Sequence, residues 1–273
     1  MADWLETAEG EAPLVVAFPH TGTEVAPEIE ARLTSPWLAR KDADWRIEQL
    51  YDFARDLGAT VLRTRISRTV IDVNRDPSGA SLYPGQATTE LCPTTSFDGE
   101  PLYRPGLGPD ADEIQLRRTR WFAPYHDALE AQIRRLRARH PTVVVYDAHA
   151  IRSRIPRLFN GELPHFNIGT NSGASCAPEL AGAVFETCGA EGFSRILDGR
   201  FKGGWTTRRY GRPADGVHAV QMELACRAYL DEPDNPVPDD AWPPPWDPAR
   251  AEPCRTVLRG VLTSCLQFAE SEA

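Results

Sequence analysis

Two short apolar runs, each followed by a histidine, place the strongest constraint on what this chain can fold into. Residues 14–18 (LVVAF) and 142–146 (TVVVY) are rich in β-branched residues and have the length of buried strands. His20 follows the first run and His149 follows the second. In open α/β sheets, ligands bind along the edge formed by the carboxyl ends of the strands. The sequence therefore predicts that both histidines lie at this edge.

Strands and helices alternate along the rest of the chain. Alternation of this kind predicts an α/β three-layer sandwich with a central mixed, largely parallel sheet. Gly58 is a plausible C-cap for the first long helix, and Pro124 is expected to kink or break the second. The further strands are expected over 59–62, 69–73 and 166–169, the helices over 43–57, 111–139 and 178–188, and a strand-like start passing into a helix over 216–230.

The length of 273 residues suits a single α/β domain spanning 1–273. Residues 78–109 are crowded with Gly, Pro and Thr and lack a period, which is typical of a functional loop beside an active site. Residues 231–253 contain eight prolines and predict an extended crossing, which could cover the core or face a partner. A C-terminal helix over 254–270 is expected to dock on the core.

Composition argues against several classes of protein. A net charge of −9 weakens the case for nucleic-acid binding, which needs a basic face. No stretch approaches the ~20 apolar residues of a membrane helix, and the acidic N-terminus does not resemble a secretory signal. We therefore expect a cytoplasmic protein that binds neither nucleic acid nor membrane. The six cysteines lack CxxC spacing and are expected to be free thiols, buried or semi-buried.

The two histidines could share a divalent metal ion through neutral ring nitrogens. The alternative is that His20 and His149 are unrelated loop histidines. A catalytic metal usually has three protein ligands, and the third could be Glu24, four residues after His20, or Asp44. Asp44 could equally be the N-cap of the helix that follows it. Asp147, close to His149, is better suited to fixing the tautomer of a ligand histidine.

Three further positions carry groups suited to an anionic substrate. Asn74 and Arg75 end the run IDVNR and could cradle a carboxylate, or could be a turn asparagine and a surface arginine. Arg208 lies in a glycine-containing segment, 201–211, that could approach an anionic ligand or form a plain hairpin. Glu223 lies within an apolar run and is either paired with an arginine or kept as a base.

Taken together, these segments resemble the N-formylglutamate amidohydrolase family, the deformylases of histidine catabolism. The matching pieces occur in order over nearly the whole chain. They are PHTG at 19–22, DWRIEQLYDFA at 44–54, SRTVIDVNRDPSG at 67–79, LYPGQATT at 82–89, YDAHAIRSRIPRLFNGELPHFNIGT at 146–170, GRFKGGWTTRRYG at 199–211 and HAVQMELA at 218–225. The resemblance implies a fold like that of the zinc carboxypeptidases and aspartoacylases.

The resemblance also implies a role for each candidate residue. One divalent metal ion, zinc by preference, would be held by His20, His149 and Asp44, with Glu24 as the alternative third ligand. Asn74 and Arg75 would hold a glutamate carboxylate, Arg208 would bind the side-chain carboxylate, and Glu223 would be the general base. Arg46 stands where the family often has a histidine.

The activity that follows from this resemblance is hydrolysis of N-formyl-L-glutamate to L-glutamate and formate. A metal-dependent deacylase or carboxypeptidase acting on another N-acyl amino acid would use the same residues. A metal-free binding protein on the same scaffold would need one of the ligands to be lost, and none is missing from the sequence. The expected partner is a small dicarboxylate, and the sequence does not indicate an oligomeric state.

Overall fold

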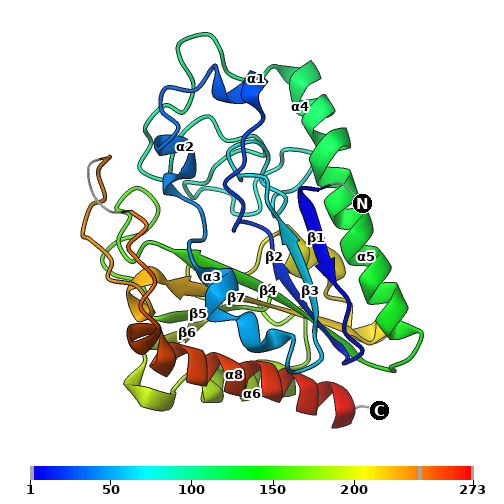
Figure 1. Ribbon diagram of the computed structural model, residues 1–273. Helices are drawn as coiled ribbons and strands as arrows, with labels where there is room; N and C mark the ends of the chain where they lie inside the picture. Colours follow the sequence, from blue (N-terminus) through cyan, green and yellow to red (C-terminus); the bar gives the residue numbers. More distant parts are fainter. Residues whose placement is uncertain (1–2, 239–241, 272–273) are drawn as a thin grey trace.

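The computed structural model describes residues 3–238 and 242–271, and its centre is a seven-stranded mixed sheet (Figure 1). The strand order is β1-β3-β2-β4-β7-β5-β6. The four strands β3, β2, β4 and β7 run parallel, whereas β1 and β5 pair antiparallel with β3 and β7. The strands are β1 (Leu5–Ala8), β2 (Leu14–Phe18), β3 (Thr60–Thr64), β4 (Val143–Ile151), β5 (Phe166–Gly169), β6 (Arg195–Leu197) and β7 (Val217–Ala225). The predicted mixed sheet is confirmed.

Helices cover both faces of this sheet. Figure 1 shows α4 and α5 along one side and α6 and α8 along the other. Two apolar clusters of buried side chains fill the spaces between sheet and helices, one on each face. The α-helices are α1 (Pro27–Glu30), α2 (Leu38–Lys41), α3 (Ile47–Leu50), α4 (Ala111–Arg117), α5 (Ala123–Arg137), α6 (Pro178–Thr187), α7 (Trp205–Tyr210) and α8 (Pro248–Ser271).

The central strands β4 and β7 differ between their two faces. Successive side chains of a strand point to opposite faces of the sheet. On the face toward α6 and α8, both strands stay apolar along almost their whole length. On the face toward α5, each begins apolar and becomes polar near its carboxyl end, at Asp147 and His149 in β4 and at Gln221 and Glu223 in β7. The polar groups therefore gather at one end of one face.

The strand predictions need three corrections. β4 continues to Ile151, so His149 lies inside a strand and pairs with Glu223 in the parallel register. Residues 69–73 are not a strand, because their backbone groups bond to loops, as when Asp72 N donates to Leu91 O. The edge strands β1 and β6 were not predicted, because they are short and lack a long apolar run.

The helix predictions also need correction. The expected helix over 43–57 is interrupted because Arg46 has a left-handed backbone with φ of 62°, so that only α3 and a 3₁₀ turn over 52–54 form. Residues 111–139 form α4 and α5 joined by a π-helical segment over 118–122, which places the break before Pro124. Residues 216–230 are not helical at their end, because β7 runs to Ala225 and a 3₁₀ turn follows.

The C-terminal part of the chain packs onto the core. Trp242 is buried, and its Nε1 donates to Lys41 O at 2.9 Å, so this part of the proline-rich crossing covers the core. Residues 239–241 of the crossing lie outside the described residues. The docking helix starts earlier than expected, at Pro248. All six cysteines are free and buried, as predicted.

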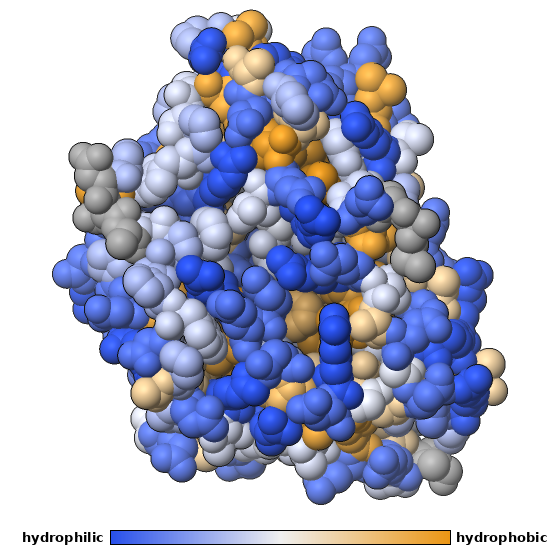
Figure 2. All heavy atoms as spheres, viewed as in Figure 1, coloured by the Kyte–Doolittle hydropathy of each residue, from blue (hydrophilic) through white to orange (hydrophobic). Residues whose placement is uncertain are grey.

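The surface is predominantly polar on the face drawn in Figure 2, where hydrophobic side chains appear only in small groups. Within residues 3–238 and 242–271, no helix has the length and apolar character needed to span a bilayer.

Candidate active site

Two histidines and an aspartate meet at the carboxyl end of the sheet. His20 follows β2, His149 lies on β4, and Asp44 precedes α3, with its backbone N–H donating to His20 O at 3.0 Å. The two Nδ1 atoms are 3.1 Å apart, and Asp44 Oδ2 lies 3.2 Å from that of His149 and 3.7 Å from that of His20. Tetrahedral zinc ligands, at bond lengths of 2.0–2.1 Å, are about 3.3 Å from one another. The three donor atoms are therefore spaced as metal ligands would be.

The chemistry of these donors also fits a cation. All three side chains are buried, and Asp44 Oδ1 has no hydrogen-bond partner among the described residues. Burial alone would raise the pKa of Asp44, but the hydrogen bonds and charges of His149 and His20 lower it below its usual value. An ionised carboxylate beside two imidazole nitrogens is a donor set that a divalent cation could occupy.

Glu24, the other candidate for third ligand, lies elsewhere. Its side chain is 43% exposed and forms an ion pair with Arg65 Nη2. The structure thus groups Asp44, and not Glu24, with the two histidines.

Each histidine is held by a second carboxylate at its other ring nitrogen. His20 Nε2 lies 2.7 Å from Asp72 Oδ1, and His149 Nε2 lies 2.9 Å from Asp147 Oδ2. A histidine that binds metal through Nδ1 carries its proton on Nε2, and these carboxylates accept that hydrogen bond. The expected position of Asp147 beside His149 is confirmed. Although burial lowers the pKa of His149, Asp147 raises it well above its usual value.

Asp72 was missed in the sequence because residues 69–73 resembled an ordinary strand. The available signal was a carboxylate within the apolar run TVIDV, the same signal that drew attention to Glu223. Burial would raise the pKa of Asp72, but the charges of His20, Arg68 and Arg75 hold it well below its usual value. Asp72 is therefore an anion inside the protein.

Asn74 and Arg75 contact this group from the turn after Asp72. The Asn74 amide donates from Nδ2 to Asp147 Oδ2 at 2.8 Å, and its Oδ1 accepts from the backbone N–H of Thr206 at 2.8 Å. Arg75 forms an ion pair with Asp72 through Nε at 3.3 Å and donates from Nη2 to Thr89 Oγ1 at 3.2 Å. Asn74 thus braces the histidine pair, while Arg75 keeps donors available for an anion.

Glu223 lies on β7 directly across from His149. Its burial raises its pKa to about 8, although the charge of His149 opposes the shift. Of the described residues, no arginine or lysine forms an ion pair with Glu223, and its side chain accepts a long hydrogen bond of 3.4 Å from Gln221 Nε2. A side chain kept as a base fits this setting better than one paired with an arginine.

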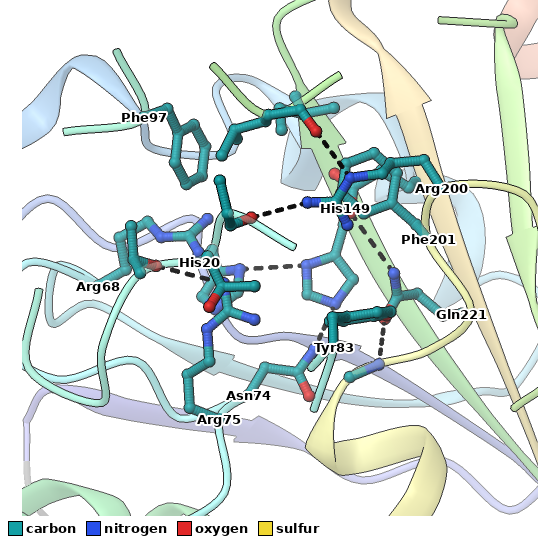
Figure 3. Close-up of a pocket in the computed structure, with 17 residues that line it drawn as sticks. His20, Arg68, Asn74, Arg75, Tyr83, Phe97, His149, Arg200, Phe201 and Gln221 are labelled. Carbon is teal, nitrogen blue, oxygen red and sulfur yellow. Dashed lines mark hydrogen bonds between the residues drawn. The ribbon is translucent and has the colours of Figure 1, made fainter. Parts of the chain in front are cut away.

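One cavity joins these groups, and Figure 3 shows the side chains around it. Residues of the loop 78–109 and of the segment before α7 close it opposite the sheet. It is lined by His20, Arg68, Asn74, Arg75, Tyr83, Ala87, Thr88, Thr89, Phe97, His149, Ile151, Leu158, Arg200, Phe201, Gly204, Gln221 and Glu223.

Arg208, which was expected to bind the side-chain carboxylate of a substrate, is not among the residues that line this cavity. Its Nε donates to Gly203 O at 3.0 Å, and its guanidinium lies 5.2 Å from the centre of the Tyr83 ring. The cavity contains Arg200 instead, which immediately precedes the segment 201–211 that was expected to approach an anion.

Known proteins match the chain along almost its whole length. The sequence pattern of the N-formylglutamate amidohydrolase family matches residues 12–230. The chain belongs to this family. Among N-formylglutamate deformylases, one from Pseudomonas aeruginosa is 44% identical over 269 residues, covering 98% of each chain. Another, from Pseudomonas putida, is 43% identical over 261 residues, covering 95% of this chain and 94% of the relative.

Two solved structures share the fold of this chain. The N-formylglutamate amidohydrolase of Ralstonia eutropha JMP134 superposes with a TM-score of 0.76 at 22% identity, covering 98% of this chain and 97% of that one. A protein from Agrobacterium tumefaciens superposes with a TM-score of 0.71 at 16% identity, covering 97% and 96%. The likeness to the zinc carboxypeptidases stays a prediction.

If His20, Asp44 and His149 hold a metal ion, replacing any one of them should reduce the metal content of the purified protein. His20→Ala, His149→Ala and Asp44→Asn each delete or weaken a direct bond, so we expect purified variants to retain little metal while keeping the wild-type circular dichroism spectrum. Metal content is measured by plasma mass spectrometry after dialysis. Glu24→Gln is the matched carboxylate control and should bind a full equivalent. A full equivalent in Asp44→Asn would contradict the assignment of the third ligand.

Asp72→Asn should weaken metal binding without abolishing it. The amide keeps the shape of the carboxylate but loses the charge that favours the Nε2 proton of His20, and such changes typically cost 10–100-fold in affinity. Competition with a chelator of known affinity measures the loss. An unchanged affinity would mean that Asp72 serves Arg68 and Arg75 alone.

Proposed function

We propose that this protein hydrolyses N-formyl-L-glutamate to L-glutamate and formate, using one divalent metal ion, zinc by preference, held by His20, Asp44 and His149. The observation that carries the proposal is that His20 and His149, which are grouped with Asp44, line one cavity together with the buried carboxylate of Glu223, in a chain 44% identical to an N-formylglutamate deformylase. A role in histidine degradation and a cytoplasmic location belong to the same proposal.

The metal supplies Lewis-acid chemistry when bound, since it lowers the pKa of a water toward about 7 and polarises the formyl oxygen. Glu223 is the proton carrier of the proposed reaction. Its carboxylate takes the proton from the attacking water as the oxygen adds to the formyl carbon, and then gives it to the departing amine nitrogen. A neighbouring cation favours the ionised carboxylate, which opposes the upward pKa shift caused by burial.

Arg75 is proposed to hold the α-carboxylate of the substrate. Its side chain is 20% exposed and borders the cavity, and its planar fork can donate two parallel hydrogen bonds. Asn74 supports this arrangement indirectly, because its amide connects Asp147 to the first turn of α7. A bound substrate is thus oriented by charge at one end while its formyl group faces Glu223.

Hydrolysis of another N-acyl amino acid is the second candidate, because the same residues would catalyse it. Formate release from N-formylglutamate, compared with acetate release from N-acetylglutamate, separates the two. An active site that fits a formyl group is expected to have little room for the methyl group of an acetyl substrate. The formyl substrate should therefore give the higher kcat/KM.

Glu223→Gln should lower kcat by about 10²–10⁴-fold because the amide cannot accept the proton from water. Metal content should stay full, since Glu223 is not a ligand in this scheme. Formate release by the metal-loaded enzyme is the measurement, and Glu24→Gln is the control with an exposed carboxylate. A folded, metal-replete Glu223→Gln enzyme with wild-type kcat would rule out its role as the base.

Arg75→Met should mainly raise KM, because the arginine contacts the carboxylate in ground and transition states alike. Removing one partner of a desolvated charged pair costs roughly 2–5 kcal/mol. Arg75→Lys should restore only part of the binding, since an ammonium lacks the planar fork. Steady-state kinetics on N-formylglutamate measure both variants, and a normal KM in Arg75→Met would contradict this role.

A further inference from the structure

Arg200 is the arginine of the cavity that has no carboxylate partner. Its Nε donates to Leu158 O and its Nη2 to Ala87 O, each at 2.8 Å. Both acceptors are neutral backbone carbonyls, which fix the direction of the guanidinium without neutralising it. Among residues 3–238 and 242–271, Arg200 forms no ion pair with a carboxylate, and its hydrogen bonds leave Nη1 available.

The other two arginines of the cavity, Arg68 and Arg75, form ion pairs with a carboxylate. Arg68 Nη2 lies 2.7 Å from Asp72 Oδ2, and Arg75 Nε lies 3.3 Å from the same oxygen. Figure 3 shows Arg75 beside Asn74 and Arg200 beside Phe201, on different parts of the cavity wall. The uncompensated positive charge therefore lies at Arg200, away from the carboxylate that serves Arg68 and Arg75.

Aromatic rings hold Arg200 in place. Its guanidinium lies 5.5 Å from the centre of the Tyr83 ring and 5.2 Å from that of Phe201, within the range of cation–π contacts. Tyr83 is itself fixed, because its hydroxyl donates to Gly203 O at 2.9 Å and accepts from Lys202 N–H. Burial and the nearby charge of Arg75 lower the pKa of Arg200, and the charge of Glu223 opposes the shift. The side chain is thus oriented before any ligand binds.

We propose that Arg200 binds the side-chain carboxylate of the substrate and thereby gives this enzyme its preference for dicarboxylates. The inference rests on the proposed function and extends it, because it assigns the second carboxylate to Arg200, in place of Arg208. Arg75 then receives the α-carboxylate, and the formyl group between them is left facing His20, His149 and Glu223. A preoriented guanidinium loses little rotational freedom when a carboxylate binds it in a bidentate fashion.

The test compares N-formylglutamate with N-formylglutamine, whose side chain has the same shape but no charge. In the metal-loaded, full-length enzyme, Arg200→Met should reduce kcat/KM for N-formylglutamate by roughly 30-fold or more. The value for N-formylglutamine should change by less than about threefold, so that the variant loses its preference. Arg200→Lys, which keeps the charge, should retain part of the preference and covers the case in which the methionine variant does not fold.

Arg157→Met is the matched control. Arg157 also donates to two backbone carbonyls of the loop 78–109, those of Ser96 and Phe97, but does not line the cavity. This variant should keep the wild-type preference. If Arg208→Met loses the preference while Arg200→Met keeps it, the assignment to Arg200 is wrong.

A binding measurement separates this inference from the proposed function. By calorimetry, the wild-type protein should bind glutarate more tightly than butyrate, and Arg200→Met should remove the difference. If that result holds but N-formylglutamate is not hydrolysed, the proposed function fails and the role of Arg200 stands. If N-formylglutamate is hydrolysed and Arg200→Met still discriminates both pairs of ligands, the role of Arg200 fails and the proposed function stands.

Discussion

Two buried hydrogen bonds between carboxylates and histidines, Asp72 with His20 and Asp147 with His149, organise the rest of the site. A buried carboxylate is costly unless it is paired and hydrogen-bonded. Both carboxylates accept further hydrogen bonds from Asn74. Its backbone N–H donates to Asp72, and its side-chain amide donates to Asp147. With each Nε2 held in this way, the two Nδ1 atoms can only face each other and Asp44. The spacing of the three donors follows from this constraint.

The sheet makes such a cluster possible because one face of a strand can change from apolar to polar along its length while the opposite face stays apolar. The apolar face of β4 and β7 toward α6 and α8 supplies burial, so the polar end does not have to contribute stability. The loop 78–109 then closes over the polar end. Ion pairs anchor this loop to the neighbouring elements, because Asp98 of the loop pairs with both Lys41 and Arg152.

The sequence allowed the prediction of parts of the structure whose signal is local. The runs 14–18 and 166–169 became strands with those bounds, and the first is an uninterrupted apolar, β-rich segment, which has few alternatives. The helix over 43–57 failed, since the left-handed backbone at Arg46 depends on tertiary contacts around Asp44 and is not encoded by periodicity. The same limit applies to the site. His20, Asp44 and His149 could be named from motifs, but the choice between Arg200 and Arg208 depends on which guanidinium borders the cavity, and sequence spacing does not contain that information.

Asp72 connects the two halves of the proposed chemistry. Its Oδ1 holds His20 Nε2 at 2.7 Å, and its Oδ2 forms ion pairs with Arg68 and Arg75 at 2.7 and 3.3 Å. Because both oxygens belong to one carboxylate, a change in the ion pairs at Oδ2 alters the strength of the hydrogen bond at Oδ1. An anion that binds Arg75 weakens the ion pair between Arg75 and Asp72. The Asp72 carboxylate then keeps more of its negative charge and polarises the Nε2–H of His20 more strongly. A more polarised imidazole is a stronger ligand through Nδ1. Substrate binding and metal binding should accordingly strengthen each other, and the shared carboxylate is the physical reason.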